Sequence, residues 1–175
     1  GKSTVLEGIN ILSTGKSSRA NVESELVSFN KHTGFVEGVI DKENEEVRLF
    51  ARFVNAEYKS NKSKKQIKVN GVPRLVSSLV GNFTCVLFTP EDMNMILGSP
   101  SIRRKYLDNV LSQTSKDYRK SLSNLNKAFK NRNKILEKIN KEGRGREELP
   151  FWNETLLSLS GKIHEYRETL VTFVN

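Results

Sequence analysis

The sequence contains little cysteine, histidine or tryptophan, and it has no long apolar run. Its 175 residues include one cysteine, Cys85, which excludes an internal disulfide framework and is typical of proteins in a reducing compartment. The two histidines, His32 and His164, lie far apart with no cysteine or carboxylate pattern around them, so we predict neither a metal centre nor a catalytic dyad. No apolar stretch reaches the ~18 residues of a membrane span, and we expect no signal peptide and no membrane partner.

The chain is basic, and its positive charge is concentrated in one segment. The net charge is +9, 28% of the residues are charged and the mean hydropathy is −0.51. Residues 102–148 carry 14 lysines and arginines against 6 acidic residues, a net +8. This concentration favours sequence-independent contact with a polyanion such as DNA, and a solvated lysine-rich helix face is the alternative. The candidates for DNA binding are Lys116, Arg119, Lys120, Lys127, Lys130 and Lys134.

The first four residues match the end of a phosphate-binding loop. Gly1-Lys2-Ser3-Thr4 precedes apolar residues at positions 5, 6, 9 and 12, which share one face of a helix. In such a loop the helix N-terminus holds phosphate oxygens, Lys2 would neutralise the terminal phosphates and Ser3 would ligate Mg²⁺. The full motif also needs an earlier glycine and a strand. Either the match is accidental, or the chain is a fragment that begins inside the motif.

A Gly/Ser-rich basic loop at residues 13–19 is expected to end this helix. An ordinary helix terminus is one interpretation. If the loop instead folds back beside a bound nucleotide, Arg19 could supply a charge-assisted contact to the phosphates.

The next part of the chain predicts an antiparallel sheet. Val47, Leu49, Ala51 and Phe53 alternate with polar residues, which places one face of a strand on a core and the other in water. We expect a polar turn at residues 41–45, a mobile lysine-rich loop at 59–65, a turn at Asn70-Gly71 and a short helix at 72–79. The predicted strands are residues 26–29, 34–40, 46–53 and 66–69.

Between residues 85 and 108 the pattern changes from strands to helices. A short strand is predicted at 85–88, ended by Pro90, and Ser99-Pro100 is a helix start with Ser99 as N-cap. Arg104 and Asp108 are four residues apart on the new helix and can pair.

Two heptad patterns follow. Apolar residues spaced alternately by four and three run from Leu107 to Ile139 and include Leu122, Phe129 and Leu136. This predicts one continuous helix of up to ~60 Å. Residues 142–146 and Pro150 interrupt the pattern, which resumes from Trp152 to Phe173. Two such helices joined by a short loop form an antiparallel helical hairpin.

Taken together, these segments resemble the RecF family of bacterial recombination mediators, whose ATPase head belongs to the ABC class alongside SMC proteins. The most specific stretches are residues 86–92, Gly98-Ser99-Pro100 and 103–108, which resemble the strand-to-arm junction of that family. Residues 1–7 resemble the tail of its Walker A motif, and 15–19 resemble the basic loop that follows. Asn126-Lys127 with residues 130–133 resembles a motif in its arm.

The resemblance implies an α/β fold: an ABC-type P-loop ATPase lobe of mixed or antiparallel sheet and helices at residues 1–98, and an all-helical arm at 99–175. It implies ATP and Mg²⁺ as cofactors, bound through Gly1, Lys2, Ser3, Thr4 and Arg19, with Ser3 on the metal. Arg103, Arg104 and Asp108 would set the angle of the arm at the lobe junction. ABC heads place a glutamine near this junction, and Glu91 is the candidate sensor in its place.

A protein of this family would act in the bacterial cytoplasm at the nucleoid. It would dimerise around ATP on DNA and load recombinase at single-strand gaps with partner mediator proteins, in DNA replication, repair and the SOS response. We expect a fragment truncated at both ends that does not hydrolyse ATP alone, because the catalytic carboxylate and signature motif lie beyond it. The alternatives are a non-catalytic basic coiled-coil module that binds nucleic acid or protein, or another SMC-like ATPase head.

Overall fold

The computed structural model describes residues 1–20, 22–42, 45–55 and 65–174. The chain divides into two compact units, residues 1–102 and 103–175, which are described separately. Among the helices that the structure describes, none is long and apolar enough to cross a membrane.

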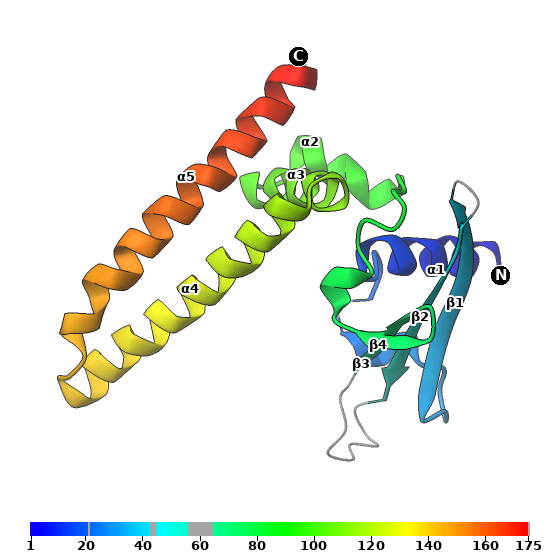
Figure 1. Ribbon diagram of the computed structural model, residues 1–175, viewed down its shortest axis with the longest axis horizontal. Coiled ribbons are helices and arrows are strands. Elements are labelled where there is room, and N and C mark those ends of the chain that lie inside the picture. Colours follow the sequence, from blue (N-terminus) through cyan, green and yellow to red (C-terminus); the bar gives the residue numbers. More distant parts are fainter. Residues whose placement is uncertain (21, 43–44, 56–64, 175) are drawn as a thin grey trace. The chain divides into compact units, whose positions relative to one another are not determined.

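The first unit is built on a four-stranded antiparallel sheet (Figure 1). Its strands follow one another in space in the order of the chain: β1 (Thr33–Lys42), β2 (Glu45–Val54), β3 (Lys65–Val69) and β4 (Val72–Arg74). In β2, Leu49, Ala51 and Phe53 are buried, and the residues between them lie on the opposite face. The strands predicted at 34–40, 46–53 and 66–69 are therefore confirmed.

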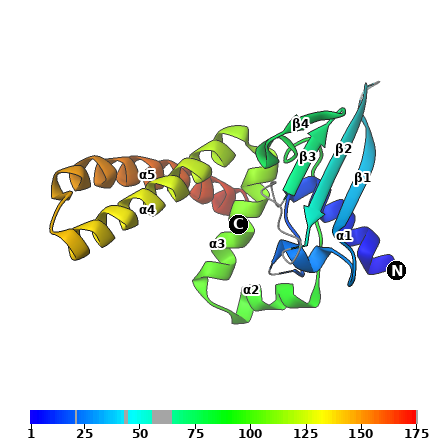
Figure 2. The same cartoon turned by 90° about the horizontal axis from the view of Figure 1, so that it is seen from below.

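Helix α1 (Lys2–Thr14) packs against one face of this sheet and completes the core (Figure 2). Its residues Ile11 and Leu12 are buried with the inward residues of β2 and β3. Gly38 makes the close approach possible, because a Cβ built there would lie 2.9 Å from a methyl group of Leu12. The helix ends at Gly15, whose φ of 72° is the left-handed conformation that glycine adopts at low cost.

Three predictions for this unit are wrong. Residues 26–29 are not a strand: a 3₁₀ helix, Glu23–Leu26, precedes Val27, which reaches the core from a loop. Residues 72–79 are not one helix, because the Asn70-Gly71 turn has positive φ at both residues and returns the chain to pair as β4. A 3₁₀ turn, Val76–Ser78, then follows.

The third wrong prediction is the strand at 85–88. A strand requires a ladder partner, and the described sheet consists of β1 to β4 without this segment. Val86 and Phe88 are exposed instead. Residues 43–44 of the predicted polar turn at 41–45 lie outside the described residues. The same is true of residues 59–64 of the predicted lysine-rich loop at 59–65.

Short helices connect the sheet to the second unit. A 3₁₀ helix, Pro90–Met93, and α2 (Asn94–Leu97) lead to α3 (Pro100–Thr114), which begins at the predicted proline. The Ser99 hydroxyl lies 2.7 Å from that of Ser101.

The second unit is the predicted helical hairpin, formed by α4 (Lys116–Glu142) and α5 (Leu149–Val174), with a 3₁₀ turn, Arg146–Glu148, between them (Figure 1). The prediction of one continuous helix from Pro100 is wrong. Ser115 has extended backbone angles, and its hydroxyl accepts a hydrogen bond from the amide of Tyr118 at 3.1 Å, so it caps a new helix.

The buried side of α4 differs in part from the predicted heptad seam. Tyr118 and Leu125 are buried as expected, and Ile163 of α5 packs with them. Farther along, Ala128 and Ile135 are buried, whereas Phe129 and Leu136 are 47% and 37% exposed. The spacing of four and three is retained, but every second buried position lies one residue earlier than predicted, with Ala128 buried in place of the larger Phe129.

A polar network joins the three helices of this unit. The guanidinium of Arg167 on α5 donates two hydrogen bonds to Asp108 of α3, at 2.7 and 2.9 Å, and the hydroxyl of Tyr118 on α4 donates to the same oxygen. The predicted pairing of Asp108 with Arg104 is therefore wrong: Arg104 is exposed, and the partner of Asp108 comes from α5.

The network also affects protonation. Burial and the hydrogen bond to Asp108 raise the pKa of Tyr118 to about 12, so its hydroxyl stays protonated and continues to donate. Burial acts to lower the pKa of Arg167, but its hydrogen bonds to Asp108, the charge of Asp108 and the interaction with Tyr118 together outweigh burial, and the pKa is raised.

Replacing Asp108 with alanine is expected to destabilise the chain by about 2 kcal/mol, because the Arg167 and Tyr118 donors lose their acceptor in a half-buried position. Urea unfolding followed by circular dichroism measures the change. Arg104→Ala is the matched control and is expected to change stability by less than about 0.5 kcal/mol. Equal losses for the two variants would contradict the pairing described here.

Candidate functional site

The N-terminus of α1 presents the predicted phosphate-binding residues to solvent. The side chains of Lys2, Ser3 and Thr4 are exposed on its first turn. The Thr4 amide donates to the carbonyl of Gly1 at 3.1 Å, which closes the turn. The first amides of a helix lack partners within it and carry the positive end of the helix dipole. This end of α1 can therefore attract an anion, with the Lys2 ammonium and two hydroxyl groups beside it.

The basic loop after α1 folds back along the helix. The hydroxyl of Ser17 donates to the carboxylate of Glu7, and the side-chain amide of Asn10 donates to the carbonyl of Lys16 at 3.1 Å. The Ser17 oxygen also accepts hydrogen bonds from the amides of Arg19 and Ala20, at 3.0 and 2.8 Å. These contacts return Arg19 alongside α1 with its side chain exposed.

Lys65 holds the base of this loop, a role that the sequence did not indicate. The sequence placed Lys65 at the end of a mobile loop, but it begins β3 and its side chain is only 10% exposed. Its ammonium donates to the Gly15 carbonyl and to Glu23, at 2.6 Å each, and lies 5.1 Å from the ring centre of Phe53. The alternation of polar and apolar residues over 65–69 is the one signal in the sequence that could have placed Lys65 in a strand.

The two carboxylates at the candidate sensor position differ in their contacts. Asp92 accepts hydrogen bonds from the amide and the hydroxyl of Thr89, at 2.6 and 3.1 Å, and so stabilises the 3₁₀ helix. Glu91 is exposed, and its carboxylate has no hydrogen bond or ion pair to the residues that the structure describes. Among those residues no group of three or more metal-ligating side chains occurs.

The second unit carries a continuous basic surface on α4, called the lysine face. With 3.6 residues per turn, its residues lie within about 80° of the helix circumference. The centre of the buried side lies about 150° away. All residues of the lysine face are exposed, and two of them, Lys138 and Lys141, were not among the predicted DNA-binding residues. The lysine face consists of Lys116, Lys120, Lys127, Lys130, Lys134, Lys138 and Lys141.

Arg119 lies outside the lysine face, although it was a predicted DNA-binding residue. Its guanidinium donates to the carbonyl of Ser112 in the last turn of α3, and burial lowers its pKa. It therefore stabilises the α3–α4 corner. Arg103 and Arg104 are both exposed at the start of this unit.

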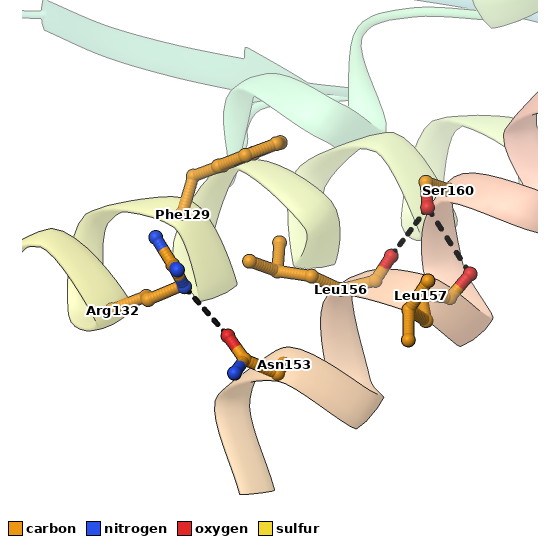
Figure 3. A pocket seen from close by; sticks show the side chains of 6 residues that line it. All are labelled: Phe129, Arg132, Asn153, Leu156, Leu157 and Ser160. Carbon is orange, nitrogen blue, oxygen red and sulfur yellow. Dashed lines mark hydrogen bonds between the residues drawn. The ribbon is translucent and has the colours of Figure 1, made fainter. Parts of the chain in front are cut away.

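A shallow groove lies between α4 and α5 (Figure 3). Phe129, Leu156 and Leu157 supply its apolar lining, and the Nε of Arg132 donates to Asn153 at 2.7 Å across its end. The heptad prediction placed Phe129 in the seam and so missed this surface.

Comparisons with known proteins agree on one family. The chain is 38% identical to the DNA replication and repair protein RecF of Thermoanaerobacter sp. (strain X514) over 169 residues, which is 96% of this chain and 45% of the relative. RecF of Caldanaerobacter subterraneus subsp. tengcongensis is also 38% identical, over 168 residues, 95% of this chain and 45% of the relative. No family model matches the chain.

A solved structure of the recombination mediator protein RecF with ATP, from the RecFOR pathway, has the same fold. It superposes with a TM-score of 0.87 at 37% identity and covers 98% of this chain and 45% of that one. The chain thus spans a little under half the length of the relatives that it matches.

Proposed function

The chain belongs to the RecF family of DNA replication and repair proteins and has the fold of an ABC-type ATPase lobe with a helical arm, and on this premise we propose that it anchors the phosphates of ATP and holds DNA. The lysine face of α4 is the observation that carries the proposal. The ATP part and the DNA part of this function rest on different residues.

The ATP part rests on the first turn of α1. Lys2 would neutralise charge on the terminal phosphates, the free amides would hold phosphate oxygens, and Arg19 would contact them from the returning loop. The exposed Ser3 hydroxyl suits an oxygen-preferring ion such as Mg²⁺, which would neutralise the bound phosphates further. Glu91, exposed and uncommitted among the described residues, remains our candidate sensor.

Lys2→Ala is expected to weaken ATP binding about tenfold, because one full charge next to the phosphates is lost. Fluorescence anisotropy of a labelled ATP analogue, with Mg²⁺ present, measures the affinity. Lys31→Ala removes an exposed lysine from a turn of the same unit and should leave the affinity unchanged. If the two variants bind equally well, Lys2 does not anchor the nucleotide.

The DNA part rests on the arrangement of charge along α4. Seven exposed lysines follow one side of the helix, and each can neutralise a phosphate without reading a base. The ammonium of Lys138 lies 3.9 Å from the carboxylate of Glu148, which partly neutralises its charge. The lysines in the middle of the lysine face are therefore the stronger contacts for DNA. Family membership favours this interpretation over a solvated helix face.

The triple substitution Lys120, Lys127 and Lys134→Gln is expected to weaken binding to duplex DNA and to reduce the slope of log K against log salt by about 2 to 3. Fluorescence anisotropy with a labelled duplex at several salt concentrations gives both quantities. The matched control is Lys31, Lys42 and Lys162→Gln, which removes the same charge outside α4. Equal effects of the two triple variants would show that only net charge matters.

We further propose that the longer protein pairs around ATP and works with DNA-repair partner proteins at single-strand gaps, in the bacterial cytoplasm. Arg103 and Arg104, exposed at the start of the second unit, are proposed to adjust the arm against the ATPase lobe. Asp108 contributes indirectly, because it fixes α3 to α5.

A further inference from the structure

The face of the sheet opposite α1 carries an aromatic pair in which Phe35 is exposed and Phe50 is partly buried. Phe35 of β1 and Phe50 of β2 stack with their ring centres 5.9 Å apart and their planes inclined by 23°. Phe35 is 67% exposed, so much of its ring remains open to solvent. A cross-strand aromatic pair stabilises a sheet, but that role does not require one ring to be so exposed.

Basic side chains surround this pair. The register places Arg52 opposite Phe35 and Lys68 opposite Phe50, and the Lys68 ammonium lies 5.6 Å from the ring centre of Phe50. Arg48 follows on the same face of β2. The side chain of Arg52 makes no ion pair with any residue that the structure describes, and its Nε is buried without a hydrogen-bond partner among them.

Acidic residues on this face are few near the aromatic pair. Glu37 lies opposite Phe50, and its carboxylate is 3.7 Å from the guanidinium of Arg48, which offsets its charge. Asp41 and Glu46 oppose each other closer to the tip of the β1–β2 hairpin. Around the two rings, the three basic side chains therefore outweigh the one carboxylate.

We propose that this face binds an unpaired segment of single-stranded DNA, with one base stacked on Phe35 and the neighbouring phosphates held by Arg52, Lys68 and Arg48. An exposed aromatic ring beside several cations on an antiparallel sheet provides the two contacts that such a strand requires. Each base has a flat face, so the contact is tolerant of sequence. A duplex keeps its bases stacked inside and cannot use Phe35 in this way.

This site uses different residues from the lysine face of α4, for which we propose contact with the phosphates of duplex DNA. The inference depends on the proposed function only in taking DNA as the ligand. The two sites can be distinguished, because they respond to different substitutions and different DNA.

The test compares binding of a 20-nucleotide oligo-dT and of a 20-base-pair duplex to the 175-residue chain and its variants. Phe35→Leu is expected to weaken oligo-dT binding about tenfold and to leave duplex binding unchanged. Phe29→Leu is the matched control, since Phe29 is 97% exposed in the same unit and lies outside the sheet. It should leave both affinities unchanged.

A single 2-aminopurine in the oligonucleotide reports stacking directly. Its fluorescence is expected to fall when it binds the parent chain and the Phe29→Leu variant, and to fall less with Phe35→Leu. The proposal is overturned if the parent chain fails to bind oligo-dT or if Phe35→Leu binds oligo-dT as tightly as the parent does. It is also overturned if Phe35→Leu loses as much affinity for the duplex as for oligo-dT. The arm proposal is judged separately, from duplex binding by the lysine variants.

Discussion

Burial of one side of α4 against α5 is the constraint on which the arm depends. A helix holds its faces in fixed angular relation, so burying Tyr118 and Leu125 leaves the lysines on the far side in water. The network of Asp108, Tyr118 and Arg167 fixes the start of this arrangement, because one carboxylate oxygen receives donors from both α4 and α5. The lysine face is therefore a consequence of the hairpin core.

A similar dependence operates in the first unit. The sheet buries its inward residues beneath α1, and Gly38 lets the helix approach closely. Lys65 and Ser17 then hold the following loop along α1, which keeps Arg19 beside the helix. On the opposite face of the sheet Phe35 is exposed, next to the partly buried Phe50 and to Lys68. In each unit, the residues that are buried in the core determine which side chains of the same helix or sheet remain exposed.

The sequence predicted the main elements well where a pattern repeats over many residues. The alternation in β2 and the four-three spacing of α5 are of this kind. It failed where a single contact decides the structure: the Ser115 cap divides a continuous heptad pattern, and Asp108 pairs with Arg167, 59 residues away, rather than with Arg104 nearby. Lys65 and the stacked Phe35 were missed because their roles depend on cross-strand register, which composition does not reveal.

The most direct measurement is a lysine-reactivity footprint of the chain with and without duplex DNA. Acylation followed by mass spectrometry reads each lysine separately, so Lys127, Lys130 and Lys134 can be compared with Lys162, which is also exposed, on α5. DNA held on the lysine face is expected to reduce the reactivity of the three α4 lysines severalfold and to leave Lys162 unchanged. Unchanged reactivity at all three in the presence of saturating DNA would contradict this role for α4.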